Sequence, residues 1–344
     1  MADLKIEPAK TALVVIDLQR GIVSMPAAPR PAVEVVERAA QIATALRQAG
    51  GTVVFVHVTP SADRKDGLRP ITDAAPAAGW APPPDWADLV LAADDPRLVA
   101  VRSAVRANPQ AATVLAVLLR SGGARSIPEG LLAESTAYGL LQGGPEFARW
   151  RSGRSVRHRA TGDGPAVLVR RRDDELWVTL NRPRVLNALD SAMRDELETA
   201  LHVAVMDPSI TSVHLDGAGP SFCSGGDLQE FGTRSDPPSA HLVRLLRNPA
   251  RTIAELADRT VAHLHGDVVG SGVELAAFAH RVVAARSTRL SLPEVRLGLI
   301  PGAGGTVSLP RRIGRHRTLL LALAVQSVDA ATALDWGLVD EVSG

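Results

Sequence analysis

Short apolar runs that end at glycine-containing turns recur through the second half of the chain. An apolar strand is predicted over 261–264, and it leads through the Gly-Ser-Gly turn 270–272 into a stretch with helical spacing, 273–279. A further strand follows over 281–285. The first backbone N–H groups of a helix lack intrahelical partners and lie at the positive end of its dipole, so this turn favours a bound anion beside Glu274.

The residues before this stretch repeat the same alternation of strand, loop and helix. Strands are expected over 166–170, 175–180 and 212–215, and a helix over 190–206 begins at Asp190, a good N-cap residue. Glycines stand at the strand ends. The pattern therefore predicts an α/β fold built of stacked ββα turns.

The first half of the chain has a different organisation. A strand over 11–16, a helix over 32–49 and a strand over 52–58 form one βαβ unit of a parallel sheet, with Asp17 at the carboxyl end of its first strand. Residues 59–95 are rich in proline, alanine and aspartate, which is typical of a linker. We therefore assign 1–95 to a partial α/β (βαβ) unit and its linker.

Short helical segments separate this unit from the later repeats. They occupy 96–150, each is apolar on one face, and each ends at Asn-Pro or Gly-Gly. Glu134, Ser135 and Tyr138 fall on one of them, and we expect a capped, partly exposed face there. With the basic linker that follows, this gives a small helical segment over 96–160 and a C-terminal core over 161–344.

Composition excludes several classes of protein. The 344 residues are 46% hydrophobic and 22% charged with a net charge of +1, which gives no indication of a nucleic-acid or membrane partner. The single cysteine, Cys223, excludes an internal disulfide and a cysteine zinc site, and no metal site is expected. The N-terminus lacks an apolar signal core, so we expect a cytoplasmic protein.

The stretches ALVVIDLQRGIV and VVFVHVTP, with the helix between them, resemble the isochorismatase-like hydrolases over about residues 10–90. The resemblance implies that Asp17 acts with a later lysine and usually a cysteine nucleophile. The only lysines are Lys5, Lys10 and Lys65, and Cys223 lies in a different motif. We therefore expect this part to be a catalytically silent remnant or fusion partner, with isochorismatase-type hydrolysis at Asp17 as the alternative.

Four later motifs, LNRPRVLNAL, FCSGGDL, GSGVELA and PEVRLGLIPGAGG, resemble the crotonase (enoyl-CoA hydratase/isomerase) superfamily in order and spacing over about 165–341. The resemblance implies a crotonase-like spiral of ββα units and an acyl-CoA substrate. It implies no cofactor beyond the coenzyme A of that substrate, and a homo-oligomer, a trimer or hexamer.

The chemistry implied by this resemblance centres on four residues. The amides of Gly226 and Ser271 correspond to the two donors of an oxyanion hole, which stabilise the charge that gathers on the thioester carbonyl oxygen. Glycine is more usual where Ser271 stands. Glu274 and Glu294 correspond to the two glutamates of the hydratases: the first helps to activate water for attack at the β-carbon, and the second delivers a proton to the α-carbon.

The resemblance also implies that Arg184, Leu186 and Ala188 bind the nucleotide end of coenzyme A. Asp227 is expected to cap a following helix, and Cys223 and His265 are expected to be structural. Family members usually continue with helices that cover the acyl site, whereas this chain stops at Gly344, so we expect 96–150 to supply part of that cover.

Hydration of a 2-enoyl-CoA thioester is the favoured function. Double-bond isomerisation, thioester hydrolysis and a non-catalytic acyl-CoA-binding or scaffold role remain as alternatives.

Overall fold

The computed structural model divides into two compact units, Met1–Ser103 and Ala104–Gly344. It describes residues 12–16, 40–42, 44, 45, 48, 52–56, 88–91, 95–154, 164–233, 236–324 and 326–344. Each unit is described by itself.

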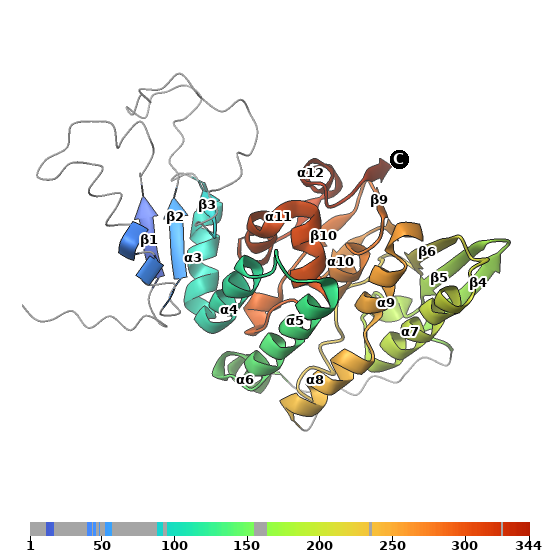
Figure 1. The fold of residues 1–344 in the computed structure, drawn as a ribbon, viewed down its shortest axis with the longest axis horizontal. Coiled ribbons are helices and arrows are strands. Elements are labelled where there is room, and N and C mark those ends of the chain that lie inside the picture. Colours follow the sequence, from blue (N-terminus) through green and yellow to red (C-terminus); the bar gives the residue numbers. More distant parts are fainter. Residues whose placement is uncertain are drawn as a thin grey trace, which may run out of the picture. The chain divides into compact units, whose positions relative to one another are not determined.

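The first unit contains a three-stranded parallel sheet in the order β1, β2, β3 (Figure 1). Strands β1 (Ala12–Ile16) and β2 (Thr52–Val56) confirm two of the predicted strands. The prediction of a linker as far as residue 95 is wrong at its end, because β3 (Val90–Leu91) pairs with β2. Asp17 and most of the predicted helix 32–49 lie outside the described residues.

Four helices follow, as the apolar spacing predicted. Helix α5 begins at a capping box: Ser126 Oγ accepts from the Glu129 amide, and the Glu129 carboxylate accepts from the Ser126 amide at 2.8 Å. In the second unit, α4 and α5 both pack against α11 (Gly305–Leu323). The four are α3 (Arg97–Ala107), α4 (Pro109–Arg120), α5 (Ile127–Gln142) and α6 (Pro145–Ser152).

A six-stranded sheet forms the centre of the second unit. The first pair, β4 and β5, is antiparallel and all later neighbours are parallel. Side chains of β5 alternate between buried and half-buried, because one face of the strand packs under α7 (Ser191–Met206). The order is β12 (Glu341–Ser343), β9 (Arg281–Ala285), β7 (Thr260–Leu264), β6 (Ser212–Gly217), β5 (Glu175–Leu180) and β4 (Val167–Arg172).

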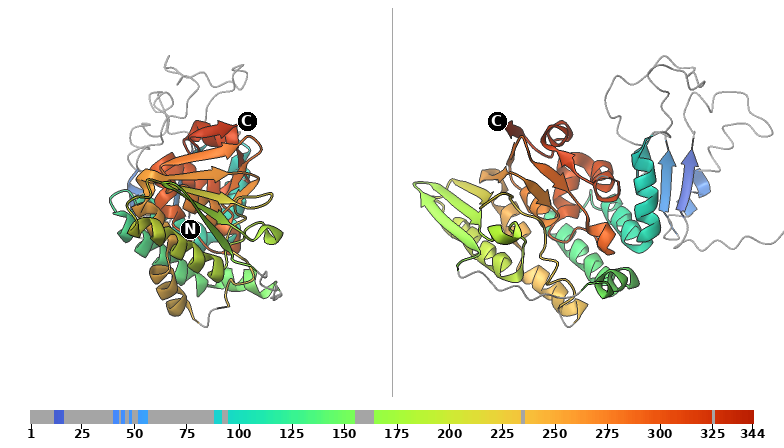
Figure 2. Two further views of the ribbon diagram at one scale, coloured as in Figure 1. Left: turned by 90° about the vertical axis from the view of Figure 1, so that its right-hand side faces the viewer. Right: turned by 180° about the vertical axis from the view of Figure 1, so that it is seen from behind.

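A second, smaller sheet is formed by short strands that directly follow strands of the first. Strand β8 (Asp267–Val269) follows β7, and β10 (Arg289–Ser291) follows β9, so each turn of chain gives one strand to each sheet. Strand β11 (Val328–Asp329) closes this sheet, and a bridge between Cys223 and Val268 extends the pattern to the loop after β6. This is the crotonase-like ββα spiral expected from the sequence (Figure 2).

Helices cover the spiral and shape its loops. Helices α5 and α8 pack side by side (Figure 1). Helix α11 bends at Gly314, where φ is 77°. No helix begins at Asp227, because residues 228–232 form a turn. The remaining helices are α8 (Pro237–Leu246), α9 (Pro249–Glu255), α10 (Ser271–Ala276) and α12 (Ala330–Trp336), with 3-10 turns η2 (Pro183–Val185), η3 (Ala257–Arg259) and η4 (Glu294–Leu297).

Among the described residues, no helix is both long enough and apolar enough to cross a membrane.

The Asn187 side chain links the loop after β5 to the loop after β6 by hydrogen bonds. Its side-chain oxygen accepts from the Arg182 amide at 2.7 Å, and its amide nitrogen donates to the carbonyls of Ala218 and Ser221 at 2.9 and 2.8 Å. The residue is fully buried and has a φ of 55°, a left-handed conformation that asparagine tolerates. One side chain therefore holds both loops that precede the glycine-rich turn at 225–226.

We expect Asn187→Ala to lower the free energy of unfolding by roughly 2–4 kcal/mol, because it leaves buried donors and acceptors without partners. Urea denaturation measures the change. Asn181→Ala is the matched control, since the Asn181 side chain makes one exposed hydrogen bond, to the Pro165 carbonyl, and its loss is expected to cost less than about 1 kcal/mol. Equal losses in the two variants would contradict the role given to Asn187.

Candidate functional site

A cavity of about 380 Å³ in the second unit brings together the four residues predicted to carry the chemistry. Gly226, Ser271, Glu274 and Glu294 all line it, although they come from the loop after β6, from α10 and from η4. The other lining residues are Tyr138, Gln142, Leu189, Ser191, Arg194, Asp227, Glu230, Phe231, Thr233, Ala240, Val243, Arg244, Gly302 and Ala303.

Among the backbone amides on the cavity wall, those of Gly226 and Ser271 have no acceptor within the described parts of the chain. Their neighbours are paired, because the Asp227 amide donates to the Leu189 carbonyl at 2.9 Å and the Gly270 amide donates to the Ser291 carbonyl at 3.0 Å. Buried N–H groups are rarely left unpaired. The two free donors therefore suit an anionic oxygen of a ligand.

A side chain at position 226 would displace the ring of Phe231. A Cβ there would lie 2.7 Å from Cε1 of Phe231, a contact shorter than side chains make. The chain conformation is held by the Leu189 amide, which donates to the Gly225 carbonyl at 2.8 Å. Glycine at 226 thus leaves room for the Phe231 ring in its present position.

Glu274 is held by the start of helix α11. Its Oε2 accepts from the amides of Ala303 and Gly305 at 2.7 and 2.9 Å, which are free because they lie at or before the first turn of the helix. The side chain is 2% exposed. Burial is the main cause that raises the pKa of Glu274 well above its ordinary value, and the nearby Glu294 and Glu134 act in the same direction.

A third carboxylate, Glu134 of α5, accepts hydrogen bonds from the other two amides at this helix start, those of Gly304 and Thr306. Glu134 Oε1 accepts from Gly304 at 2.7 Å, and Oε2 accepts from the amide and hydroxyl of Thr306 at 2.8 and 2.7 Å. Four successive amides, 303–306, therefore donate alternately to Glu274 and Glu134. Burial raises the pKa of Glu134 to about 7, against the opposite effect of its hydrogen bonds.

The sequence prediction for this face of α5 is wrong. Glu134, Ser135 and Tyr138 were expected on a capped, partly exposed surface, and all three are buried. The signal that would have placed them is their helical spacing: they continue the stripe of the buried Leu131 and Leu141. Because Tyr138 and Gln142 line the cavity, α5 supplies the kind of cover that was expected from the segment 96–150.

Glu294 is also buried, but its carboxylate accepts fewer of the described hydrogen bonds than those of Glu274 and Glu134. Its Oε2 has no hydrogen-bond partner in the part of the chain that the structure describes. Burial raises the pKa of Glu294 to about 7. A Cβ on Gly270, where φ is 49°, would overlap Oε1 of Glu294, so glycine is needed for this carboxylate to approach the turn before Ser271.

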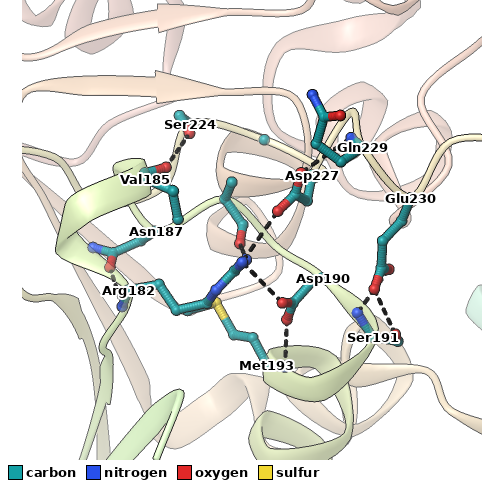
Figure 3. A network of polar contacts seen from close by, with 12 residues as sticks. Arg182, Val185, Asn187, Asp190, Ser191, Met193, Ser224, Asp227, Gln229 and Glu230 are labelled. Atoms are coloured by element: carbon teal, nitrogen blue, oxygen red, sulfur yellow. Dashed lines mark hydrogen bonds and ion pairs between the residues drawn. The ribbon is translucent and has the colours of Figure 1, made fainter. Parts of the chain in front are cut away.

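An arginine clamp joins the loop after β5 to the glycine-rich turn (Figure 3). Arg182 forms ion pairs with Asp190 at 3.0 Å and Asp227 at 3.1 Å, and it also donates to the Ala188 carbonyl. Asp227 accepts from the Gln229 amide at 3.1 Å and so stabilises a turn, where a helix cap had been predicted.

The residues predicted to bind coenzyme A lie outside the cavity, unlike the four residues predicted to carry the chemistry. Arg184 and Leu186 are exposed on the η2 turn, Ala188 is buried behind Arg182, and none of the three lines the cavity. Their role in binding coenzyme A stays a prediction.

Cys223 and His265 are not positioned to take part in proton transfer in the cavity. Burial raises the pKa of Cys223 to about 11, so its side chain is a thiol at neutral pH. His265 forms a 3.1 Å hydrogen bond with the Gly219 carbonyl. Neither residue lines the cavity. Within the described ranges, no cluster of three or more His, Cys, Asp or Glu is suited to a metal ion.

Family models match both parts of the chain. The family model for enoyl-CoA hydratase/isomerase matches residues 175–344, and the isochorismatase domain model matches residues 11–127, further than the resemblance over 10–90. A peroxisomal bifunctional enzyme of Danio rerio is 38% identical over 48% of this chain and 22% of its own length.

Two bacterial relatives are similar over a larger share of their own length. 1,2-Epoxyphenylacetyl-CoA isomerase of Escherichia coli is 36% identical over 48% of this chain and 65% of its own length. A Bacillus subtilis protein named for enoyl-CoA hydratase/isomerase is 33% identical over 52% of this chain and 70% of its own length. The chain thus spans less than two thirds of the Danio rerio and E. coli relatives.

Among solved structures, enoyl-CoA hydratase from Bacillus anthracis is 33% identical and covers 52% of this chain and 70% of its own, with a TM-score of 0.48.

We expect the stability of the protein to fall as pH rises from about 4.3, the ordinary pKa of a glutamate, to about 7, the raised pKa of Glu134. In this window the folded protein holds a proton that the unfolded chain has released, so stability decreases with pH. Glu134→Gln removes one such group, and thermal unfolding measured from pH 4 to 8 should show a shallower fall.

Glu129→Gln, at the exposed start of the same helix, is the control. Hydrogen bonds with Ser126 lower the pKa of Glu129, so its stabilising effect is lost as pH falls, and its removal should flatten the acid side of the profile instead. An unchanged slope above pH 5 in Glu134→Gln would refute the buried-proton explanation.

Proposed function

Because the chain belongs to the enoyl-CoA hydratase/isomerase family, we propose that it adds water across the double bond of a 2-enoyl-CoA thioester. The observation that carries this proposal is the presence of two carboxylates, Glu274 and Glu294, on the cavity that also exposes the unpaired amides of Gly226 and Ser271. The proposal covers the activity, the substrate and the partners of the protein.

The two amides would hold the thioester carbonyl oxygen. Attack of water at the β-carbon moves electrons toward that oxygen, and two donors aimed at it stabilise the resulting enolate without reorganisation of solvent. The free amides of Gly226 and Ser271 support this assignment, and the side chain of Ser271 does not weaken it, because the donor is the backbone N–H.

Glu274 and Glu294 would share the proton transfers. Glu274 accepts a proton from the water whose oxygen attacks the β-carbon. Glu294 gives a proton to the α-carbon. The product therefore carries a hydroxyl on the β-carbon and one more hydrogen on the α-carbon, which together amount to one added water. Burial raises the pKa of Glu274 and its two amide hydrogen bonds offset only part of that rise, so the assignment of Glu274 as the base rests on the resemblance to the hydratases. Glu294, with a pKa raised to about 7 and an unpartnered oxygen, is suited to hold the proton.

Double-bond isomerisation is the second candidate, because the E. coli relative carries the name of an isomerase. Isomerisation uses the same oxyanion donors but moves one proton between carbons and needs no positioned water. Hydration is favoured because two carboxylates reach the cavity. Steady-state assays with 2-enoyl- and 3-enoyl-CoA thioesters distinguish the two reactions.

For the N-terminal unit we propose a role without isochorismatase-type catalysis. The only cysteine of the chain is buried in the second unit, outside the range 11–127 that the isochorismatase model matches, and its raised pKa makes it a poor nucleophile. We also propose a homo-oligomer, which size-exclusion chromatography with light scattering would test.

We expect Glu274→Gln and Glu294→Gln each to lower kcat for hydration of crotonyl-CoA by about 10²–10⁴-fold, the usual contribution of a positioned acid or base. Binding of the saturated butyryl-CoA, measured by calorimetry, should change little. Glu230→Gln is the control on the same cavity, because Glu230 is already occupied by Ser191. Full hydratase activity in both active-site variants would exclude the two-glutamate mechanism.

Ser271→Pro tests the oxyanion hole at its backbone. Proline is tolerated at the first position of a helix, which Ser271 occupies, but it removes the N–H. We expect a loss of about 2.7–4 kcal/mol in transition-state stabilisation, or about 10²–10³-fold in kcat. Ser271→Ala keeps the amide and should retain activity within a few-fold. A large loss in the alanine variant would assign the role to the hydroxyl.

A further inference from the structure

Among the described residues, six charged side chains line the cavity, and four of them form ion pairs or accept hydrogen bonds from other groups of the protein. Asp227 pairs with Arg182, and Arg194 pairs with Asp195 at 2.7 Å. Glu230 accepts from the amide and hydroxyl of Ser191 at 2.8 and 2.7 Å, and Glu274 is held by the α11 amides. Glu294 is assigned to proton transfer, and Arg244 is the charge that the proposed reaction does not use.

Arg244 is a half-buried cation held only by neutral groups. Its Nε donates to Ser135 Oγ at 3.0 Å, Nη1 to Gln142 Oε1 at 3.0 Å, and Nη2 to the Ser135 carbonyl at 3.3 Å. The guanidinium also lies over the ring of Tyr138, 4.7 Å from its centroid. Three of its five N–H groups are thus used, and the described residues provide no ion pair for it.

These contacts orient the guanidinium but leave its charge uncompensated. The carboxylate that acts on it at longer range is Glu134, which already accepts three hydrogen bonds. Burial lowers the pKa of Arg244, yet arginine remains charged in proteins. A half-buried cation without a counter-ion is costly unless a ligand supplies the anion.

We infer that Arg244 is a specificity-determining residue that binds a carboxylate at the far end of the acyl group, so that the enzyme acts on thioesters of short dicarboxylic acids. The inference rests on the proposed function and names its substrate class. Two free N–H groups of a planar guanidinium match the two oxygens of a carboxylate.

The surroundings of Arg244 place this subsite beside the reacting groups. Its aromatic partner Tyr138 contacts the chain at Gly302, next to Ala303, whose amide holds Glu274. Phosphate groups of coenzyme A are the other source of anionic oxygens. The residues that the resemblance assigns to the nucleotide, such as Arg184, do not line this cavity, which favours the acyl end.

The size and lining of the cavity agree with a short, polar acyl group. Its volume is about 380 Å³, near the lower end of ligand sites in proteins. The wall near Arg244 carries Gln142 and Tyr138, and the apolar residues of α8 that reach it, Ala240 and Val243, are small or medium-sized. A long alkyl chain would have to bury itself against these polar groups, which is unfavourable.

The test uses the full chain and three probes that do not react: glutaryl-CoA, pentanoyl-CoA with the same number of acyl carbons, and free coenzyme A. Calorimetric titration of the wild type should show glutaryl-CoA binding at least about tenfold tighter than pentanoyl-CoA, a difference of about 1.4 kcal/mol. Arg244→Met should bring that ratio to about one and leave the affinity for pentanoyl-CoA and coenzyme A unchanged. Arg247→Met, exposed on α8 just beyond its last turn, is the control and should keep the wild-type ratio.

Equal affinity of the wild type for the two thioesters overturns the inference. This outcome is measured on the wild type alone, so it does not depend on whether the Arg244→Met variant folds. A parallel loss for all three probes in Arg244→Met also overturns it and assigns the guanidinium to phosphate or to the fold. Arg244→Gln, which keeps a hydrogen-bonding side chain, should lose the preference as well. If neither thioester nor coenzyme A binds the wild type, the proposed function itself fails.

Discussion

The candidate site depends on the start of helix α11, where four successive amides are divided between two buried carboxylates. Glu274 comes from the ββα spiral and Glu134 from the preceding helical segment, and each accepts from every second amide of 303–306. A helix start supplies free donors and a favourable dipole, so it can hold negative charge that would otherwise be too costly to bury. The same interaction fixes Glu274 on the cavity and attaches α5 to the core.

Because the two carboxylates share one helix start, they are not electrically independent. Glu134, Glu274 and Glu294 each have a pKa raised mainly by burial, and the charge of Glu134 raises the pKa values of Glu274 and Glu294 further. Protons leave such a cluster in steps that belong to the cluster and not to single residues. A residue outside the stretch that the family model matches, 175–344, thus influences the protonation of the candidate catalytic pair.

The sequence predicted the elements of the second unit well because their signals are local. Alternation along β5, the N-cap at Asp190 and the glycines at strand ends each act within a few residues. The four motifs also identified the residues that reach the cavity. Glu134 was missed because its partners, Gly304 and Thr306, are about 170 positions away, and no local pattern distinguishes a buried capping carboxylate from an exposed one.

The position of α5 also brings polar side chains to the cavity. Helix α5 places Tyr138 and Gln142 on the wall of the cavity, and it packs against α8, which contributes Arg244. Ser135 and Gln142 of α5 then hold the guanidinium toward the cavity. One helix therefore serves two ends of the proposed substrate. Glu134 stabilises the loop that orients Glu274, and Ser135 and Gln142 orient the cation that we assign to the far end of the acyl group.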